Sequence, residues 1–450
     1  MKIVLATNGY PPQRWAGTET YTAGIAGELQ RRGHDVRVLC AGVWDQGPRA
    51  CNGFDDQTHE GVRVRRLNLN WTAAPDPFRR LYDNPTTARL FGDLLAAEPP
   101  DVVHVTSCET LSAAVVGVAK RAGLPVVLSL TDFWFLCPRI NLVRSDGEAC
   151  DGRVTPWDCL RCQLRRTAWF RRAEATLPPP AVRAAANLVA RLPVLARRPG
   201  LRGMAGDMAA RRAFLRAALA QADLRITAST FVRGVFEACG VTDPIHVTPY
   251  GHDLAWLAGY TGKTPAPALR IGFIGQVART KGVHVLLEAL RLLSPDHARR
   301  IHAVIYGRVD AASPYAAELA ALAQGLPHVD CRGTYRHEDS AAVYAGLDVL
   351  AVPSLWHDFP LVMHEAFATG TPVIATELGG MAEAVAHGVN GLLFPRGDAA
   401  ALARQLQRLL DEPALLPSLR AGIRPVRTIA DEVTELESHY RRLAAAPVPA

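Results

Sequence analysis

The segment 353–376 constrains the fold of this chain more than any other, because it encodes a loop, a helix and a strand in immediate succession. The apolar run that leads into it, DVLAVPS, predicts a buried strand. A helix is expected over 359–369, since Pro360 stands where a first helical residue can lack its N–H, and Gly370 ends it. TPVIAT then predicts the next strand. This order favours a parallel α/β sheet.

Polar groups gather at the start of that helix. The first helical amides, at Leu361 and Val362, are expected at the carboxyl ends of the strands, where open α/β sheets bind ligands and free N–H groups attract anions. Glu365 follows a little over one turn later, near enough to accept a hydrogen bond from a ligand hydroxyl. The alternative is a solvated helical glutamate that binds nothing.

Length and composition indicate a two-domain α/β protein. At 450 residues the chain is too long for one ordinary core and suits two domains of similar size. The net charge of +7 is carried almost wholly by arginine, since only Lys2, Lys120, Lys263 and Lys281 are lysines. This bias is compositional, and we do not predict nucleic-acid binding from it.

Several features predict a cytoplasmic protein. MKIVLAT leads straight into a Pro-rich loop and lacks a small-residue cleavage site, so it predicts a first strand rather than a signal peptide. No apolar run approaches the ~20 residues of a membrane span. Nine cysteines, an odd number, argue against a disulfide framework and for a reducing compartment.

Strands and helices alternate along both halves of the chain. KIVLAT, DVRVLC, VRVRRLNL, DVVHVTS, PVVLSL and DLRITAS predict strands in the first half, with helical segments between most of them. LRIGFIG, HAVIYGR, DVLAVPS and TPVIAT do so in the second half. The pattern predicts doubly wound sheets.

Lys281 is expected at the amino end of the helix KGVHVLLEALRLL. A lysine there opposes the helix dipole, at a cost of roughly 0.3 to 1 kcal/mol for an exposed end, and a bound anion would reverse that sign. In a chain that otherwise uses arginine, this lysine indicates an anion site. The alternative is an ordinary surface lysine.

A cysteine cluster precedes an arginine-rich segment. Cys137, Cys150, Cys159 and Cys162 end in a CxxC pair, and four thiolates can hold one structural zinc. Free thiols in a loop are the alternative. Residues 163–220 carry many arginines and few acids. They predict either a basic amphipathic hairpin, peripheral at the inner face of a membrane, or a surface extension over the first domain, which we favour because the apolar side is mostly alanine.

The segment 353–376 resembles the signature of retaining, nucleotide-sugar-dependent glycosyltransferases of the GT-B fold, in particular glycosyltransferase family 4. That signature is Glu, seven residues, Glu, then Ala, Gly and Pro-Val. Five positions of this chain match it: Glu365, Ala366, Gly370, Pro372 and Val373. The first Glu is replaced by His357, and Asp358 follows it. Only 163–220 lies outside the resemblance.

The resemblance implies two Rossmann-like domains that face a central cleft. The first, acceptor-side domain is expected over 1–248, with the Cys-rich loop 137–162 and the insertion 163–220. The second, which binds the nucleotide sugar, is expected over 249–425. The remaining segment 426–450 would form a helix that crosses back to the first domain.

The resemblance also assigns the donor site. Lys281 and Gly17, the glycine of a loop that could equally be a simple turn, would face the diphosphate, and Glu365 would hold the ribose. Gln276 replaces the arginine that accompanies the lysine in the family, and Arg279 is a candidate to compensate. Further donor contacts are expected from Gly307, Tyr335, His357, Asp358, Phe359, Pro360, Leu361 and Val362.

Thr131 and Asp132 follow the strand PVVLSL, where the family usually has His-Asp beside the acceptor. Threonine cannot take a proton near pH 7, so any step that depends on the family's histidine would fall to Asp132 or to no residue at all. A cap of a turn is the alternative role for Asp132. The chain has no Asp-x-Asp motif, so no catalytic metal is expected.

We therefore predict a hexosyltransferase that moves a sugar from a UDP or GDP sugar to a hydroxyl acceptor, either a small molecule or lipid-linked. Lys281, Glu365 and Asp132 are its predicted catalytic residues. The pathway class would be cell-surface glycan, glycolipid or natural-product synthesis. Two alternatives stay open: a sugar phosphorylase or sugar-phosphate synthase, and a catalytically silent scaffold, which the changes at Thr131, Gln276 and His357 favour.

Overall fold

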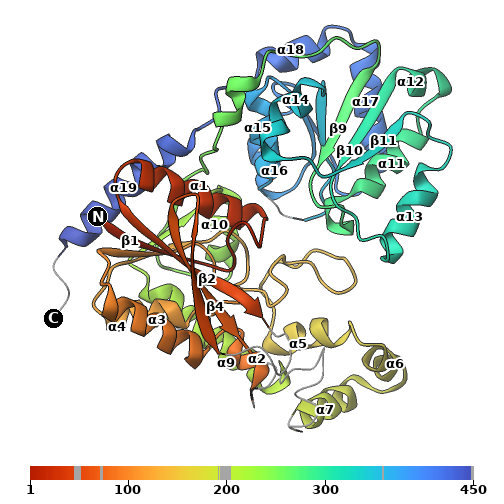
Figure 1. Ribbon diagram of the computed structural model, residues 1–450. Coiled ribbons are helices and arrows are strands. Elements are labelled where there is room, and N and C mark those ends of the chain that lie inside the picture. The colour runs from red at the N-terminus through yellow and green to blue at the C-terminus, as the bar shows by residue number, and fades with distance from the viewer. Residues whose placement is uncertain are drawn as a thin grey trace. The chain divides into compact units, whose positions relative to one another are not determined.

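The chain divides into two compact units, each built on its own sheet (Figure 1). The computed structural model describes residues 1–44, 52–70, 74, 76–190, 192, 204–356 and 359–446. Unit 1 comprises Met1–Tyr250 and Ile429–Ala450, and unit 2 comprises Gly251–Thr428. The division therefore falls two to three residues after the domain boundaries expected at 248 and 425.

Unit 1 contains an eight-stranded sheet of order β3-β4-β2-β1-β5-β6-β7-β8. All of its neighbouring strands run parallel except β3 and β4, an antiparallel hairpin that the sequence pattern did not predict. The chain winds outward in both directions from β1 and β5, so the carboxyl ends of these two strands form a topological switch point. Its strands are β1 (Lys2–Thr7), β2 (Asp35–Trp44), β3 (Gly53–His59), β4 (Val62–Leu69), β5 (Val102–Val105), β6 (Val126–Ser129), β7 (Leu224–Thr227) and β8 (Ile245–Val247).

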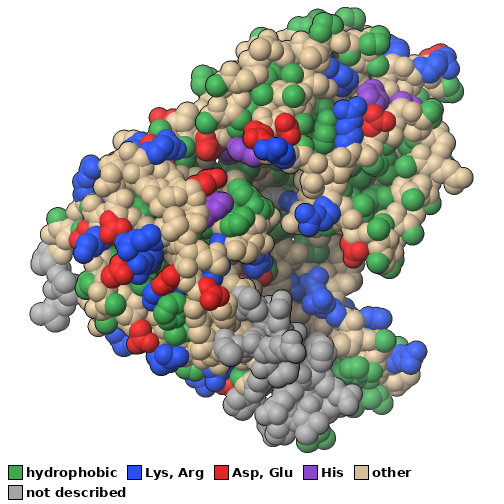
Figure 2. All heavy atoms as spheres, viewed as in Figure 1, with side chains coloured by type: hydrophobic (Ala, Val, Ile, Leu, Met, Phe, Trp, Pro, Cys, Tyr) green, Lys and Arg blue, Asp and Glu red, His purple; other side chains and the backbone are tan. Residues whose placement is uncertain are grey.

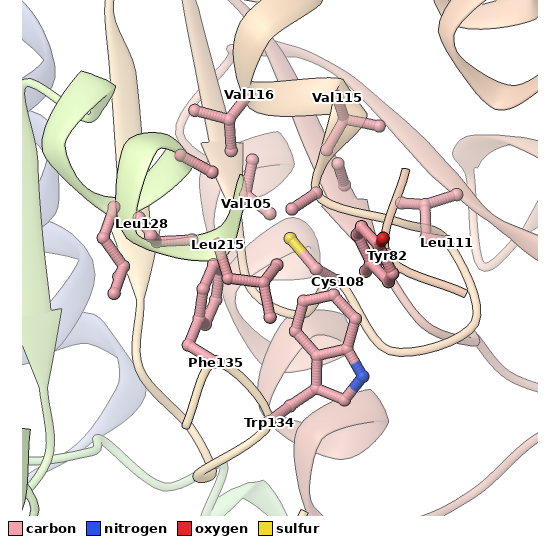
Figure 3. Close-up of a cluster of buried hydrophobic side chains, with 14 of the residues drawn as sticks. Tyr82, Val105, Cys108, Leu111, Val115, Val116, Leu128, Trp134, Phe135 and Leu215 are labelled. Atoms are coloured by element: carbon pink, nitrogen blue, oxygen red, sulfur yellow. The ribbon is translucent and has the colours of Figure 1, made fainter. Parts of the chain in front are cut away.

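Helices cover both faces of this sheet. On one face, α1 and the last helix of the chain, α19, bury Ile25, Leu29 and Val433 against the strands. On the other face, α3, α4 and α9 form the larger core, part of which Figure 3 shows around Cys108 and Trp134. The helices of unit 1 are α1 (Gly17–Arg31), α2 (Pro77–Arg80), α3 (Pro85–Ala97), α4 (Ala114–Arg121), α5 (Pro156–Leu164), α6 (Ala168–Thr176), α7 (Pro179–Ala190), α9 (Met204–Gln221), α10 (Thr230–Ala238) and α19 (Ile429–Ala445).

Unit 2 contains a six-stranded parallel sheet of order β11-β10-β9-β12-β13-β14. Here the switch point lies between β9 and β12. Short apolar runs such as Val349–Val352 are buried on both faces, which is typical of parallel sheets. The strands are β9 (Leu269–Ile274), β10 (Ile301–Tyr306), β11 (Val329–Gly333), β12 (Val349–Val352), β13 (Val373–Thr376) and β14 (Gly391–Phe394).

The helices of unit 2 again lie on both faces. Residues of α11 and α17 bury Leu286, Leu402 and Leu406 on one face, and residues of α14, α15 and α16 bury Tyr344 and Met363 on the other. These elements are η2 (Ala255–Gly259), η3 (Arg279–Lys281), α11 (Val283–Arg291), α12 (Pro295–Arg299), α13 (Pro314–Ala323), η4 (His337–Asp339), α14 (Ser340–Ala345), α15 (Leu361–Ala368), α16 (Gly379–Ala384), α17 (Ala399–Asp411) and α18 (Leu415–Ala421).

Both predicted doubly wound sheets are present. Among the helices of the described residues, none is long and apolar enough to span a membrane.

Candidate active site

Helix α15 begins at the carboxyl end of β12 in unit 2. It starts at Leu361, and Pro360 is its N-cap with extended backbone angles, φ −70° and ψ 117°. The expected helix start near Phe359, with Pro360 inside the helix, is therefore wrong, because the ψ of Pro360 is not helical. Gly370, with φ 65°, follows the last turn as predicted. The first amides of α15 have no partner within the helix, which suits them to an anion.

Glu365 projects from α15 into a group of tyrosines. The Tyr344 hydroxyl donates a 2.7 Å hydrogen bond to Glu365 Oε2. Tyr344 is fully buried, and its ring stacks on Trp256 at 5.4 Å. Burial raises the pKa of Glu365, while the Tyr344 hydrogen bond and nearby His337 oppose that rise. The Tyr335 ring meets the Tyr306 ring edge-on at 5.4 Å, and burial and the nearby Glu365 carboxylate raise the pKa of Tyr335.

Lys281 lies in the turn η3, between β9 and α11, directly before the N-cap residue Gly282 and so at the amino end of α11, as predicted. Its amide donates to the Ala278 carbonyl at 2.9 Å, and Gly282, at φ 75°, caps α11. The Lys281 ammonium lies 5.4 Å from the centre of the Trp356 ring, in the loop after β12. Lys281 is thus held where the loops of two neighbouring strands meet at the switch point.

Two glycines allow these loops to approach closely. A Cβ on Gly282 would lie 1.8 Å from the Pro353 carbonyl oxygen, and one on Gly307 would lie 1.9 Å from the Gly275 oxygen. Hydrogen bonds also join the loops, since the Leu355 amide donates to the Thr280 carbonyl at 2.7 Å. The backbone at this edge of the sheet is therefore packed too tightly for any side chain at these glycines.

The other predicted donor-site residues of the first loop differ in their environments. Gln276 is exposed. The Arg279 guanidinium forms a salt bridge with Glu318 of α13 and lies 5.2 Å from the centre of the Tyr315 ring. Arg279 is therefore paired with Glu318. It was expected to supply the positive charge that the neutral Gln276 lacks.

Phe359 belongs to a stack of three rings. It stacks on His364 of α15 at 4.9 Å, and His364 stacks on His252 at 4.5 Å. Burial lowers the pKa of His364 to about 4 and that of His252 to about 3. The predicted residues His357 and Asp358 lie outside the described part of the chain.

A second polar group lies at the switch point of unit 1. The side chain of Asn8, after β1, donates to Glu19 of α1 at 3.1 Å and to Glu109, after β5, at 3.3 Å. Arg14 forms a 3.0 Å salt bridge with Glu19, which is only 1% exposed. Gly17 is the first residue of α1 and has open space beside it.

Thr131 and Asp132 follow β6 at the same edge. The Thr131 hydroxyl donates to the Thr106 carbonyl at 3.1 Å. Asp132 accepts a 2.7 Å hydrogen bond from the Trp134 amide, which is the turn-capping role considered above. Burial raises the pKa of Asp132 to about 7, and the nearby Glu109 carboxylate adds to this rise. Asp132 can therefore exchange a proton near neutral pH.

All four predicted zinc ligands line one cavity of about 260 Å³ in unit 1: Cys137, Cys150, Cys159 and Cys162. The thiols are free, and burial raises the pKa of Cys159 to about 11. Within the described residues, no three His, Cys, Asp or Glu side chains are arranged to hold one metal ion. The structural zinc stays a prediction.

Comparison with known proteins places the chain in a family. The family model described as "Glycosyl transferase 4-like domain" matches residues 16–251, more than half of the chain, and the model described as "Glycosyl transferases group 1" matches 268–412.

The chain belongs to glycosyltransferase family 4.

Curated relatives match this family 4 protein over part of their length. A D-inositol 3-phosphate glycosyltransferase of Corynebacterium urealyticum is 39% identical over 155 residues, which are 33% of this chain and 36% of that protein. One from Streptomyces bingchenggensis is 34% identical over 196 residues, 40% of this chain and 43% of that protein. The chain therefore matches less than half the length of these relatives.

Solved structures show the fold of the family 4 protein. Sucrose-phosphate synthase from Thermosynechococcus elongatus has a TM-score of 0.67 at 20% identity, over 99% of this chain and 100% of that one. Anabaena HepE in complex with UDP-glucose has a TM-score of 0.61 at 18% identity, over 98% and 100%. The predicted GT-B fold and the predicted family are confirmed.

Sequence reasoning missed three polar partners in this family 4 protein. Asn8 and Glu109 lie within two residues of the ends of predicted strands, so the rule that selected Asp132 would also have found them. Tyr344 had no such signal, because it reaches Glu365 from a different helix.

Proposed function

We propose that this protein transfers a sugar from a nucleoside-diphosphate sugar of the UDP or GDP type to a hydroxyl group, with retention of anomeric configuration. One observation carries the proposal. The turn that contains Lys281, the amino end of α15 and the hydrogen-bonded pair Tyr344–Glu365 all belong to elements at one switch point of the sheet. The UDP-glucose complex of HepE and the names of the inositol phosphate relatives also support it.

In this proposal, unit 2 holds the donor. Lys281 and the amides of Leu361 and Val362 bind the diphosphate, since an ammonium and helix amides both favour a dianion. Glu365 accepts from the ribose hydroxyls, and Tyr344 keeps its carboxylate oriented. Gly307 and Tyr335 flank the nucleobase. No divalent ion is assigned, because Lys281 supplies the positive charge.

The transfer depends on charge that builds on the diphosphate as the sugar–phosphate bond breaks. Preorganised donors such as Lys281 stabilise that charge more than they stabilise the bound substrate. The departing phosphate oxygen can take the acceptor proton itself, as a front-face retaining transfer allows. In unit 1, Asp132 is the proposed group that exchanges a proton with the acceptor, because its pKa of about 7 leaves both forms populated near neutral pH.

The proposed acceptor is a hydroxyl of a small molecule or of a lipid-linked sugar. Thr131 and Asp132 of unit 1 are its proposed contacts. A catalytically silent nucleotide-binding protein is the second candidate, favoured by one observation: Arg279 is paired with Glu318 and leaves the neutral Gln276 without a charged substitute.

Release of nucleoside diphosphate from a panel of UDP and GDP sugars tests the proposal. Lys281→Ala should lower kcat by roughly 100-fold, because removing one preorganised donor to a transition state costs about 2.7 kcal/mol or more. Removal of divalent ions by a chelator should leave the wild-type rate unchanged.

Arg404→Ala is the matched control, since Arg404 is an exposed cation of the same unit on α17. Equal turnover by Lys281→Ala and wild type would refute the assigned role. Binding of a nucleotide sugar without turnover by any donor would support the silent protein.

A further inference from the structure

Helices α6 and α7 of unit 1 expose an unusual number of large apolar side chains. Nine large hydrophobic residues are widely exposed in the described part of the chain, and four of them lie between positions 169 and 192. Leu188 is 64% exposed and Trp169 is 42% exposed. The four are Trp169, Leu177, Leu188 and Leu192.

The fold does not need these side chains. Other apolar residues of the same helices already attach them to unit 1, since Phe170, Val182 and Ala186 are buried in its larger core. One face of the helix pair α6–α7 therefore packs on unit 1, as expected for a surface extension of the first domain. The other face does not. The exposed apolar residues remain available to a partner.

The charge of this surface is one-sided. Arg166, Arg171, Arg172 and Arg183 are exposed, and none of them forms a salt bridge with a described residue. Glu174 is the one acidic residue between 163 and 190, and it is engaged by Arg161 and Arg165. Figure 2 shows hydrophobic and basic side chains over α6 and α7, with no acidic one on the visible face.

We propose that this α6–α7 surface, formed by Trp169, Leu177, Leu188 and the four exposed arginines, binds an anionic lipid bilayer. Tryptophan is favoured at the level of the headgroups, leucine gains by entering the acyl region, and arginines attract anionic lipids. A polyanion such as nucleic acid would satisfy the arginines and leave the leucines in water. A bilayer satisfies both, and this inference does not depend on the proposed function.

Vesicle co-sedimentation of the full chain tests the inference. Vesicles of equal parts phosphatidylcholine and phosphatidylglycerol should bind it, and pure phosphatidylcholine should not. Binding should weaken as salt rises from about 0.1 M to about 1 M, which shortens the Debye length from roughly 10 to 3 Å. The pair Arg171→Ser and Arg172→Ser should lower the partition coefficient roughly 30-fold, at about 1 kcal/mol per arginine.

Matched controls distinguish binding through this surface from nonspecific adsorption of the protein to lipid. Arg404→Ser with Arg441→Ser removes two exposed arginines elsewhere and should change binding less than twofold. Lipids brominated in the acyl chain should quench part of the tryptophan fluorescence. This quenching should be lost in Trp169→Phe. It should be kept in Trp15→Phe, because Trp15 is a tryptophan elsewhere in unit 1 that is 56% exposed.

Equal binding to neutral and anionic vesicles would overturn the inference. So would equal losses in the arginine pair and its control. Binding without Trp169-dependent quenching would also overturn it.

Discussion

At the scale of single residues, the Tyr344 hydroxyl stabilises the charged form of the Glu365 carboxyl group. Burial disfavours the charged form of a carboxyl group, and it raises the pKa of Glu365. The Tyr344 hydroxyl opposes this by donating to Oε2, which stabilises the carboxylate needed to accept from a ribose. The proposed ribose contact therefore rests on a neighbour that does not itself touch the ligand.

Tyr344→Phe should weaken donor binding. Loss of the hydroxyl removes a hydrogen bond to a charged group, at about 1.5 kcal/mol, so the donor KM should rise about tenfold at pH 7. Steady-state kinetics at varied donor concentration measure this.

Tyr260→Phe is the control, since it removes a hydroxyl that donates to the Thr369 carbonyl at the other end of α15. Its donor KM should match that of wild type. An unchanged donor KM in Tyr344→Phe would contradict the role given to Tyr344.

At the scale of elements, the packing of two loops against each other determines the position of Lys281. The loops after β9 and β12 are held together by the Leu355–Thr280 hydrogen bond and by the close contact of Gly282 with Pro353. This contact positions Lys281, the residue just before Gly282. A change at Gly282 should therefore displace Lys281, and with it the proposed donor site, through the backbone.

Gly282→Ala should destabilise unit 2 more than Gly325→Ala, since the two glycines have similar φ angles but only Gly282 has an atom close to the added Cβ. A Cβ added to Gly325, at φ 81°, would have nothing within 4 Å, whereas one on Gly282, at φ 75°, would lie 1.8 Å from a backbone oxygen. Gly325→Ala should cost about 1 to 2 kcal/mol for its left-handed backbone. Gly282→Ala should cost about 2 kcal/mol more, because the loops must move apart. Urea unfolding compares the two, and equal losses would show that the contact is unimportant.

The sequence predicts the elements well where one local signal is strong. The strands at β12 and β13 are apolar runs bounded by turn residues and lie where the sequence pattern places them, whereas α15 begins at Leu361, two residues later than expected. The β3–β4 hairpin was missed because its first strand, GFDDQTH, has almost no apolar period.

Pairings between distant elements could not be predicted. The salt bridge of Arg279 with Glu318 and the hydrogen bond of Tyr344 with Glu365 each join two helices or turns that no spacing rule connects. For the same reason, the sequence could propose four cysteines for one site but could not establish that they share a cavity.

The whole molecule should lose stability in mild acid. Burial lowers the pKa of His104, in unit 1, to about 3, and those of His252 and His364, in unit 2, to about 3 and about 4. Unfolded histidines bind protons below about pH 6.5, while these folded ones resist protonation. Their stabilisation is therefore complete above pH 6.5 and is lost as pH falls towards 4.

Between pH 6.5 and pH 5, each of these histidines should cost about 2 kcal/mol of unfolding free energy. His252→Phe keeps the ring stack and removes one proton site, so the unit 2 transition should depend less on pH. The wild-type chain is the reference, and its unit 2 transition should keep the full dependence on pH. Chemical unfolding at a series of pH values measures both, and parallel slopes would contradict this explanation.

Thermal stability against a panel of nucleoside diphosphates and their sugars tests the central claim most directly. Selective binding raises apparent stability by about 2.7 kcal/mol at a hundred times Kd. The proposed donor site predicts a shift by one diphosphate class, lost in Lys281→Ala and kept in Arg404→Ala. No shift with any nucleotide, or an equal shift in Lys281→Ala, would contradict it.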